Sequence, residues 1–345
     1  LKQPFLKKIM SFKYNISFLD KCPVATNESA EQAFQNTLAM VKKLENLGFS
    51  RYWLAEHHAS EQHASPSPEL LIAWLIAQTK TIRIGSGGVM LQHYSPYKIA
   101  ENFNILAALG EKRIDLGIGK APGGMPISTK ALQHAINTND KGTFEDQLQL
   151  LNDYLECKKN TEGVATVHPQ AKNSPEYFLL GGSEESATLA ARFNWNFVFA
   201  AHLNGNREQL KKSLQQFKQL SPQGVAIIAV QIIIADSETT ASQLAKDLEV
   251  WTLELDDGKR FKVLNEAMGH AFAQQAGKTI ISLVKEPLTV LKGTAQQVVA
   301  ALDEYYEDFL VDEFILDIPL ADHQQRQHIL DLLTEHLIEK KRAVA

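Results

Sequence analysis

The chain has 345 residues, of which 44% are hydrophobic and 22% are charged, and its formal net charge is -5. These proportions are typical of a globular protein, and the negative charge offers no basic surface to nucleic acid. The longest apolar run, residues 225–235, is too short to span a membrane and contains Gln231. We therefore expect neither nucleic acid nor a membrane as a partner.

The cysteines and the first residues bear on where the protein works. Cys22 and Cys157 are too few and too far apart to suggest a disulfide framework, and a reducing cytoplasm suits them. Residues 1–9 lack the apolar segment of a secretory signal, and Met10 is a plausible start of translation. We expect a cytoplasmic protein with an N-terminal extension, residues 1–9, followed by one domain, residues 10–345.

Eight short apolar runs predict β-strands. They are Tyr14–Leu19, Arg51–Ala55, Ile82–Met90, Arg113–Ile118, Tyr177–Leu180, Phe197–Ala200, Ala226–Ile234 and Glu313–Ile318. Between them, apolar residues at spacings of three and four predict helices. The clearest helical stretches are Ala30–Leu47, Pro68–Gln78, Lys98–Leu109, Phe144–Leu155, Leu189–Phe193 and Leu210–Leu220.

The alternation of strand and helix predicts parallel strands joined by crossover helices. Two architectures fit it, a closed eight-stranded barrel and an open doubly wound sheet. A dinucleotide-binding sheet would carry its glycine fingerprint after the first strand, but Asp20–Val24 contains no glycine. The sequence therefore favours a single α/β domain of the TIM (β/α)8 barrel type. In such a barrel the active site is built from loops at the carboxyl ends of the strands.

Two segments interrupt the pattern. Residues 119–142 join a strand to a helix through a loop long enough to form part of a ligand site. Residues 252–290, between the seventh and eighth strands, have little strong patterning, and we interpret them as an insertion or a lid.

Glycines mark the end of the third strand. Gly85, Gly87 and Gly88 bring almost no side-chain bulk there, which suits a strained backbone or the close approach of a flat ligand. Such a ligand would lie at the carboxyl end of the barrel, where we expect the active site.

The second strand ends in Glu56-His57-His58, three titratable residues in a row. They suggest acid–base chemistry, or alternatively polar residues that simply end a strand. Consecutive strand residues point to opposite sides, so Glu56 and His57 are not expected to serve one site. This argues against a metal site, although a metal-dependent hydrolase built on His57, His58 and His202 stays open as a remote alternative.

The fifth strand leads through Gly181, Gly182 and Ser183 into a helix. Free backbone N–H groups and hydroxyls at a helix start can hold a phosphate, although Ser183 could equally be a simple N-cap. Lys120, after the neighbouring fourth strand, would add a cation beside the same anion. His93 and His202 lie in similar strand-end loops, where a histidine is more often incidental than a ligand contact. Cys22 has no evident base beside it and is not expected to be a nucleophile.

Four segments together resemble the bacterial luciferase-like, flavin-dependent monooxygenases. They occur in family order and are Arg51-Tyr52-Trp53-Leu54-Ala55-Glu56-His57-His58, Gly85-Ser86-Gly87-Gly88-Val89-Met90-Leu91, Arg113-Ile114-Asp115-Leu116-Gly117-Ile118-Gly119 with Ala121-Pro122-Gly123, and Leu180-Gly181-Gly182-Ser183. The resemblance covers residues 14–335 and implies a TIM barrel that binds FMN, usually reduced, at the carboxyl ends of its strands.

The resemblance also implies roles for individual residues. His57 matches the histidine that assists flavin–oxygen chemistry as a base or a hydrogen-bond partner. Gly87 and Gly88, which follow Ser86, match a pair joined by a cis peptide under the flavin ring. The implied cofactor-binding residues are Ser86, Gly87, Gly88, Lys120, Gly182, Ser183 and Ser186, with Lys120 replacing the arginine of some relatives.

The implied reaction begins with reduced FMN, which a separate flavin reductase supplies, and O2. They form a C4a-(hydro)peroxide that oxidises an aldehyde-like or other small apolar substrate. The resemblance further implies a homodimer. Two alternatives on the same barrel stay open, a hydride-transfer oxidoreductase that uses a deazaflavin or a nicotinamide, and a flavin-binding protein without catalysis.

Overall fold

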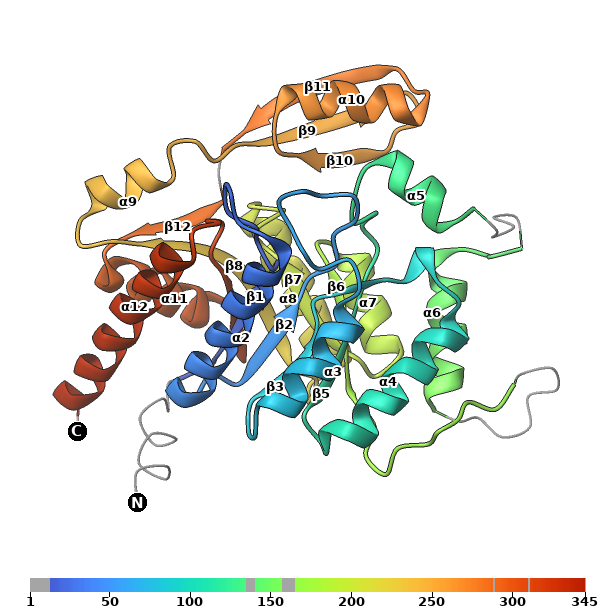
Figure 1. The fold of residues 1–345 in the computed structure, drawn as a ribbon, viewed down its shortest axis with the longest axis horizontal. Coiled ribbons are helices and arrows are strands. Elements are labelled where there is room, and N and C mark those ends of the chain that lie inside the picture. Colours follow the sequence, from blue (N-terminus) through green and yellow to red (C-terminus); the bar gives the residue numbers. More distant parts are fainter. Residues whose placement is uncertain (1–12, 135–139, 157–164, 288, 310, 345) are drawn as a thin grey trace.

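The computed structural model describes residues 13–134, 140–156, 165–287, 289–309 and 311–344, so Cys157 and the proposed extension lie outside the described residues. At its centre is a closed barrel of parallel strands (Figure 1). The barrel strands are β1 (Asn15–Asp20), β2 (Arg51–Leu54), β3 (Arg83–Ser86), β5 (Ile114–Gly119), β6 (Glu176–Gly181), β7 (Asn196–Ala200), β8 (Ala226–Ile234) and β13 (Glu313–Asp317). β1 pairs with both β2 and β13, and β8 pairs with both β7 and β13, which closes the ring.

The structure confirms the predicted TIM barrel and all eight predicted strands. The third predicted strand is divided into β3 and the short β4 (Val89–Met90), with Gly87 and Gly88 between them. Both parts pair with β5, so the interruption does not open the barrel.

Helices cover the outside of the barrel (Figure 1). They are α2 (Ala30–Leu47), α3 (Pro68–Gln78), α4 (Pro96–Gly110), α6 (Phe144–Leu155), α7 (Glu184–Arg192), α8 (Arg207–Leu220), α11 (Ala295–Phe309) and α12 (His323–Val344). The short helix α5 (Pro126–Leu132) lies instead beside the segment between β8 and α11 (Figure 1). α5 lies inside the segment expected to be a loop. α7 begins directly after Ser183, where the sequence predicts a helix start, so it extends beyond the apolar stretch Leu189–Phe193 at its amino end. Within the described residues, no helix has the length and apolar character that a membrane crossing requires.

Side chains that point into the barrel form three layers, because alternate strand residues face inward. The amino-end layer is charged and centres on Arg51. The middle layer is apolar and consists of Leu19, Trp53, Ala55, Phe178, Val198, Ile227, Ala229 and Ile315. Continuing each strand by two residues leads from Leu19 to Lys21, from Ala55 to His57 and from Ile315 to Asp317. The carboxyl end of the barrel therefore receives titratable groups above an apolar core.

The segment between β8 and α11 forms an insertion with helices and strands of its own. It contains α9 (Glu238–Leu244), β9 (Val250–Leu255), β10 (Arg260–Val263), α10 (Glu266–Ala276), β11 (Ile280–Glu286) and β12 (Val290–Gly293). β9, β10 and β11 form a separate antiparallel sheet on which α10 packs, and β12 returns to pair with β8 (Figure 1). This confirms an insertion between the seventh and eighth barrel strands.

Candidate functional site at the carboxyl end of the barrel

An ion pair stands at the carboxyl end of the barrel. Lys21 Nζ lies 2.6 Å from Asp317 Oδ2, and Gln231 Nε2 donates to the same oxygen at 2.8 Å. Burial alone would raise the pKa of Asp317, but Lys21, His202 and these hydrogen bonds hold it below its ordinary value. Asp317 is therefore a carboxylate, and Lys21 and Asp317 largely cancel each other's charge.

His57 lies above the apolar layer with its ring against His63. The two ring centres are 4.5 Å apart and the rings are tilted by 20°, which is a stacked arrangement. His57 is partly exposed, but its Nδ1 is buried and has no hydrogen-bond partner among the described residues. Burial, the neighbouring His63 and the charge of Lys21 lower the pKa of His57 to about 3. His57 is therefore neutral at physiological pH.

Two further histidines share this environment. His63 reaches the site from the loop after β2, and His202 from the loop after β7. Burial, followed by the charge of Lys21, lowers the pKa of each to about 4. Three uncharged imidazoles thus surround a single ion pair.

Glu56 and His58 face away from His57, as the alternation of strand side chains predicts. His58 Nε2 lies 2.7 Å from Glu56 Oε1, and Tyr94 donates its hydroxyl to that oxygen at 2.9 Å. Met90 N donates to the other carboxylate oxygen at 3.1 Å. Glu56 and His58 therefore tie the end of β2 to the segment after β4.

His93 belongs to the same outer region. Its Nε2 lies 2.7 Å from the carbonyl oxygen of Pro122, and its Nδ1 lies 3.0 Å from Gln133 Nε2. These contacts hold the segment after β5, whereas His202 lies beside Lys21 and Asp317. Within the described ranges, no three His, Cys, Asp or Glu side chains are placed to hold a metal ion.

Packing within the barrel leaves little room for side chains at the glycines that end β3. A Cβ on Gly85 would come within 2.5 Å of Asp115, and one on Gly87 within 2.7 Å of Leu19. A Cβ on Gly88 would lie 2.9 Å from the carbonyl oxygen of Gly117. The peptide bond between Gly87 and Gly88 is cis, as the resemblance implies.

Ser86 is fully buried, and both functions of its hydroxyl are used within the barrel. The hydroxyl donates to Gly117 O at 2.9 Å and accepts from Gly117 N at 3.0 Å. Ser86 therefore ties β3 to β5, and because the hydroxyl hydrogen is committed to Gly117 O, the side chain could meet a ligand only as an acceptor.

The predicted phosphate-binding residues follow two adjacent strands. Lys120 follows β5 and Gly182 follows β6, and these strands pair through Ile118 and Leu179. Lys120 is exposed, with its ammonium 5.8 Å from the centre of the Phe144 ring. The Lys120 ammonium and the start of α7 could both contact a phosphate at this edge of the barrel.

Ser183 and Ser186 lie in the first turn of α7. Ser183 Oγ accepts from Ser186 N at 3.3 Å, so the N-cap interpretation of Ser183 is confirmed. The two hydroxyls also lie 3.3 Å from each other. Gly181 needs its lack of a side chain, because a Cβ there would collide with Ser186. At Gly182 a Cβ would meet Asn204 at an ordinary 3.7 Å, so packing does not require this glycine.

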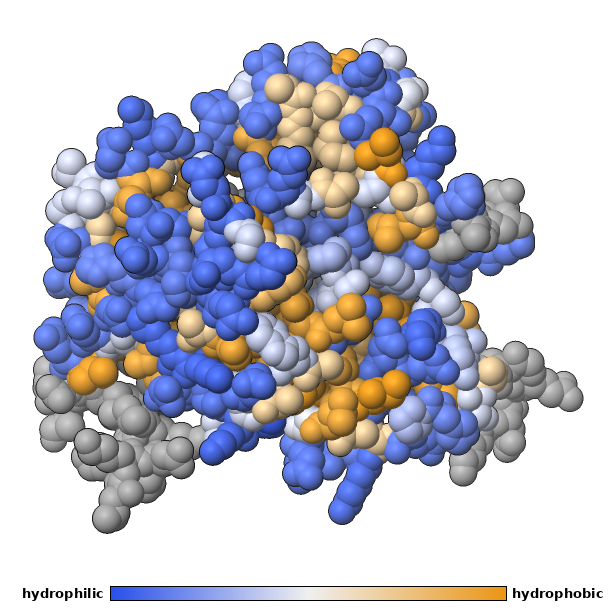
Figure 2. Space-filling model, viewed as in Figure 1, coloured by the Kyte–Doolittle hydropathy of each residue, from blue (hydrophilic) through white to orange (hydrophobic). Residues whose placement is uncertain are grey.

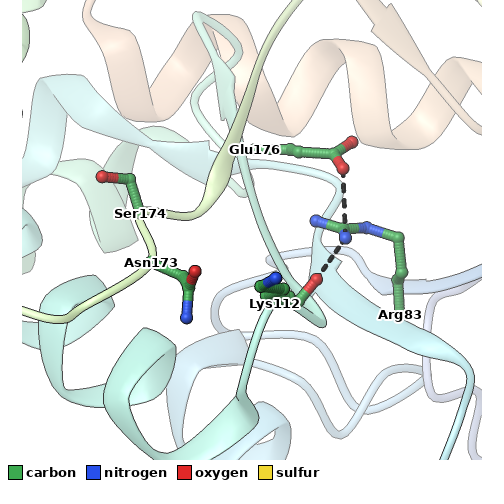
Figure 3. Close-up of a pocket in the computed structure, with 5 residues that line it drawn as sticks. All are labelled: Arg83, Lys112, Asn173, Ser174 and Glu176. Atoms are coloured by element: carbon green, nitrogen blue, oxygen red, sulfur yellow. Dashed lines mark hydrogen bonds and ion pairs between the residues drawn. The ribbon is translucent and has the colours of Figure 1, made fainter.

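A surface hollow at the opposite, amino end of the barrel lies far from these groups along the strands. Arg83, Lys112, Asn173, Ser174 and Glu176 line it (Figure 3). Arg83 pairs with Glu176 at 3.0 Å and also binds the carbonyl oxygen of Lys112. Because Arg83 and Glu176 neutralise each other, we assign this hollow no ligand.

Cys22 is buried, and the pKa of its thiol is not lowered. Burial and the charge of Asp20 raise the pKa of Cys22 to about 12. The thiol lies 3.3 Å from the Thr37 hydroxyl, outside the group around His57. Cys22 is thus a packed residue, in line with the expectation that it is not a nucleophile.

Sequence reasoning missed Lys21, His63 and Gln231. The alternation that places Leu19 inside the barrel predicts the same side for Lys21, so this residue could have been found. His63 lies in a loop, where strand alternation does not apply. An isolated backbone bridge between Pro23 and His63 places this loop beside the segment that follows β1.

A closed parallel barrel with polar groups above an apolar core is the architecture of a TIM-barrel enzyme. Residues 12–313 match the family model described as luciferase-like monooxygenase. The chain is 33% identical to the N-acetyl-S-alkylcysteine monooxygenase of Bacillus subtilis (strain 168) over 333 residues, 95% of this chain and 99% of that protein. It therefore belongs to the luciferase-like monooxygenase family, which confirms the resemblance.

Solved structures agree in fold. Apo-MsnO8 has a TM-score of 0.74 and 26% identity, and the match covers 94% of this chain and 98% of that one. The oxygenating constituent of 3,6-diketocamphane monooxygenase from the CAM plasmid of Pseudomonas putida, in complex with FMN, has a TM-score of 0.66. At 17% identity, over 95% of this chain and 98% of that one, this second likeness shows the fold alone.

Proposed function

We propose that this protein is a monooxygenase that uses reduced FMN and O2 to oxidise a small organic substrate, with a separate flavin reductase supplying the reduced FMN. The chain belongs to the luciferase-like monooxygenase family, and the observation that carries the proposal is the set of residues at the carboxyl end of its barrel. There His57 stands above the apolar layer, and Lys120 and the start of α7 follow two adjacent strands.

The residues present fit a flavin mononucleotide. Lys120, the backbone at Gly182 and the hydroxyls of Ser183 and Ser186 would hold its phosphate. Gly87 and Gly88 would lie under the ring system, with the Ser86 hydroxyl available to it only as an acceptor. Bound reduced flavin supplies the electrons with which O2 is activated. The chain's own task is to orient the ring and substrate and to exclude water.

The insertion is suited to cover this end of the barrel, and we propose that it acts as a lid. Gln275 of α10 accepts from the backbone N of Ile127 in α5 at 3.3 Å. Met125, just before α5, packs against the apolar cluster of the insertion around Leu253 and Phe272. The insertion is thereby attached to the segment that follows β5, which also carries Lys120.

An N-acetyl-S-alkylcysteine is the first substrate to test, because the Bacillus relative bears that name. With a flavin reductase, NADH and FMN, we expect substrate-dependent O2 consumption and one atom from isotopically labelled O2 in the product. A panel of aldehydes should be run in parallel. Failure to bind FMN, together with no labelled product from either substrate class, would refute the proposal.

Replacing Lys120 with alanine should weaken binding of FMN about tenfold, because a charge-assisted bond to the phosphate is lost. Binding of riboflavin, which has no phosphate, should not change. Titrations followed by flavin fluorescence measure both affinities. Lys130→Ala, an exposed lysine on α5, is the matched control. Equal losses for FMN and riboflavin would show that Lys120 does not act on the phosphate.

A homodimer remains a proposal, and an apolar surface over α3 and α4 supports it (Figure 2). Leu70 on α3 is 70% exposed and Leu109 on α4 is 62% exposed. A second copy packed on this face would remove their apolar surface from water. Light scattering should give twice the mass of one chain. The double change Leu70→Glu and Leu109→Glu should give a single chain, whereas Ile281→Glu on β11 should have no effect. A monomeric wild type would rule the dimer out.

A further inference from the structure

We propose that His57 acts on the bound ligand as a hydrogen-bond donor through Nε2–H, and that His63 is the residue that positions its ring. The alternative role, which the resemblance leaves open, is a general base. The role of His57 toward a ligand rests on the proposed function. Which ring nitrogen of His57 carries the hydrogen is a property of the protein alone and can be measured without ligand.

The first argument is the environment of the two ring nitrogens. A neutral imidazole carries one hydrogen, and that hydrogen lies on either Nδ1 or Nε2. Nδ1 of His57 is buried without a partner among the described residues, while the ring remains partly exposed. A buried N–H without an acceptor is rarer in proteins than an acceptor that lacks a donor. The hydrogen therefore belongs on Nε2, at the accessible edge of the ring.

The second argument is how the ring is held. Histidine bases are usually oriented by a hydrogen bond from their second nitrogen to a carboxylate or carbonyl group. In the described part of the chain His57 Nδ1 makes no such bond, and the ring instead stacks on His63 at 4.5 Å. His63 is fixed by the Ser60 hydroxyl, 2.9 Å from its Nδ1. The backbone of this loop is held by the bond from Ala64 N to Cys22 O, so His63 forms a rigid platform.

The third argument is the charge around the ring. His63 from the loop after β2, Lys21 after β1 and His58 on the same segment oppose protonation of His57, while Asp317 on β13 favours it. Burial and this balance lower the pKa of His57 to about 3. A base with such a pKa accepts a proton poorly at neutral pH, where general bases work best with a pKa near that of the medium. A neutral N–H donor has no such handicap and can stabilise charge that develops on a ligand atom.

The position of the hydrogen can be measured directly. In ligand-free protein with nitrogen-15-labelled histidine, NMR should show His57 as the Nε2–H form with an unprotonated Nδ1 between pH 6 and 8. His57→Gln assigns the signals, since those of His57 disappear. An Nδ1–H form, or protonation of His57 near neutral pH, would overturn the inference. Because this readout needs neither flavin nor substrate, it decides the matter even if the proposed oxygenation fails.

Amide variants provide the functional test. The side-chain NH2 of glutamine can take the place of Nε2–H, whereas that of asparagine lies nearer to Nδ1. We expect His57→Gln to keep kcat within about tenfold of the wild type, and His57→Asn and His57→Ala to lose on the order of a hundredfold. If His57 were a base, all three would lose activity alike.

The positioning role of His63 has its own test. His63→Phe keeps a flat ring for stacking and should preserve the Nε2–H signal of His57 and most of kcat. His63→Ala removes the platform and should lower kcat more than it changes KM, and the labelled His57 signals should broaden. If His63→Phe and His63→Ala behaved alike in both measurements, His63 would not position His57. His328→Gln, an exposed histidine on α12, is the control for histidine replacement.

Discussion

Replacing Arg51 with methionine is expected to lower the free energy of unfolding by about 3–5 kcal/mol, because buried carboxylates lose their cation. The Arg51 guanidinium lies 3.0 Å from Asp115, 2.8 Å from Glu176 and 3.1 Å from Glu313 at the amino end of the barrel. Asp115 and Glu313 are fully buried. Burial raises the pKa of Glu313 even with Arg51 beside it, so this carboxylate depends strongly on the cation.

Asp115 keeps a second cation, Arg83, whose Nη2 lies 2.6 Å from its Oδ1, so most of the loss comes from Glu313. Urea unfolding followed by circular dichroism measures the change. The matched control is Arg207→Met, because Arg207 pairs with Glu304 and Asp308 on the surface, where such pairs contribute at most about 1 kcal/mol. Similar losses of unfolding free energy in the two variants would show that the buried ion pairs of Arg51 contribute no more than surface pairs.

The same layering explains why the barrel could be predicted from the sequence. A strand covered on both sides needs apolar residues at almost every position, and Ala226–Ile234 meets this requirement with one exception, Gln231. That exception faces inward above the apolar layer and binds Asp317. The polar residue that breaks the run is thus a member of the candidate site.

The insertion could not be predicted in detail for the opposite reason. Its strands are covered by α10 on one face only, so polar and apolar residues alternate in them. Arg260 and Lys262 of β10 alternate with Phe261 and Val263, which gives no continuous apolar run. The partners of these short strands are set by contacts within the insertion, and one short window of sequence does not contain that information.

The candidate site was predictable to the extent that strand alternation controls it. The separation of His57 from Glu56 and His58 follows from the sequence alone. Lys21 and Asp317 lie near opposite ends of the chain and meet because β1 and β13 close the barrel. The glycines at 85, 87 and 88 are predicted to suit a strained backbone or a flat ligand, and the structure adds that neighbouring strands leave little room for a side chain there.

Stability should fall between pH 7.5 and pH 5.0, by about 6 kcal/mol from the three histidines of the site. Their folded-state pKa values, about 3 for His57 and about 4 for His63 and His202, lie below the value of about 6.5 expected in the unfolded chain. The unfolded chain therefore binds more protons in this range. Their stabilising contribution is complete above about pH 6.5 and is lost as the pH falls toward the folded values.

Each histidine accounts for about 2 kcal/mol of this loss, because all three folded-state pKa values lie below 5 and the folded protein binds almost none of these protons at pH 5. His202→Gln should remove about 2 kcal/mol of the difference between urea unfolding at pH 7.5 and at pH 5.0. His328→Gln should leave that difference unchanged, because the His328 side chain is 60% exposed on the surface of α12. If His202→Gln showed the same acid loss as the wild type, His202 would not be held neutral by the fold. The destabilisation would then have to come from carboxylates such as Asp317, whose lowered pKa places its own loss at more acidic pH.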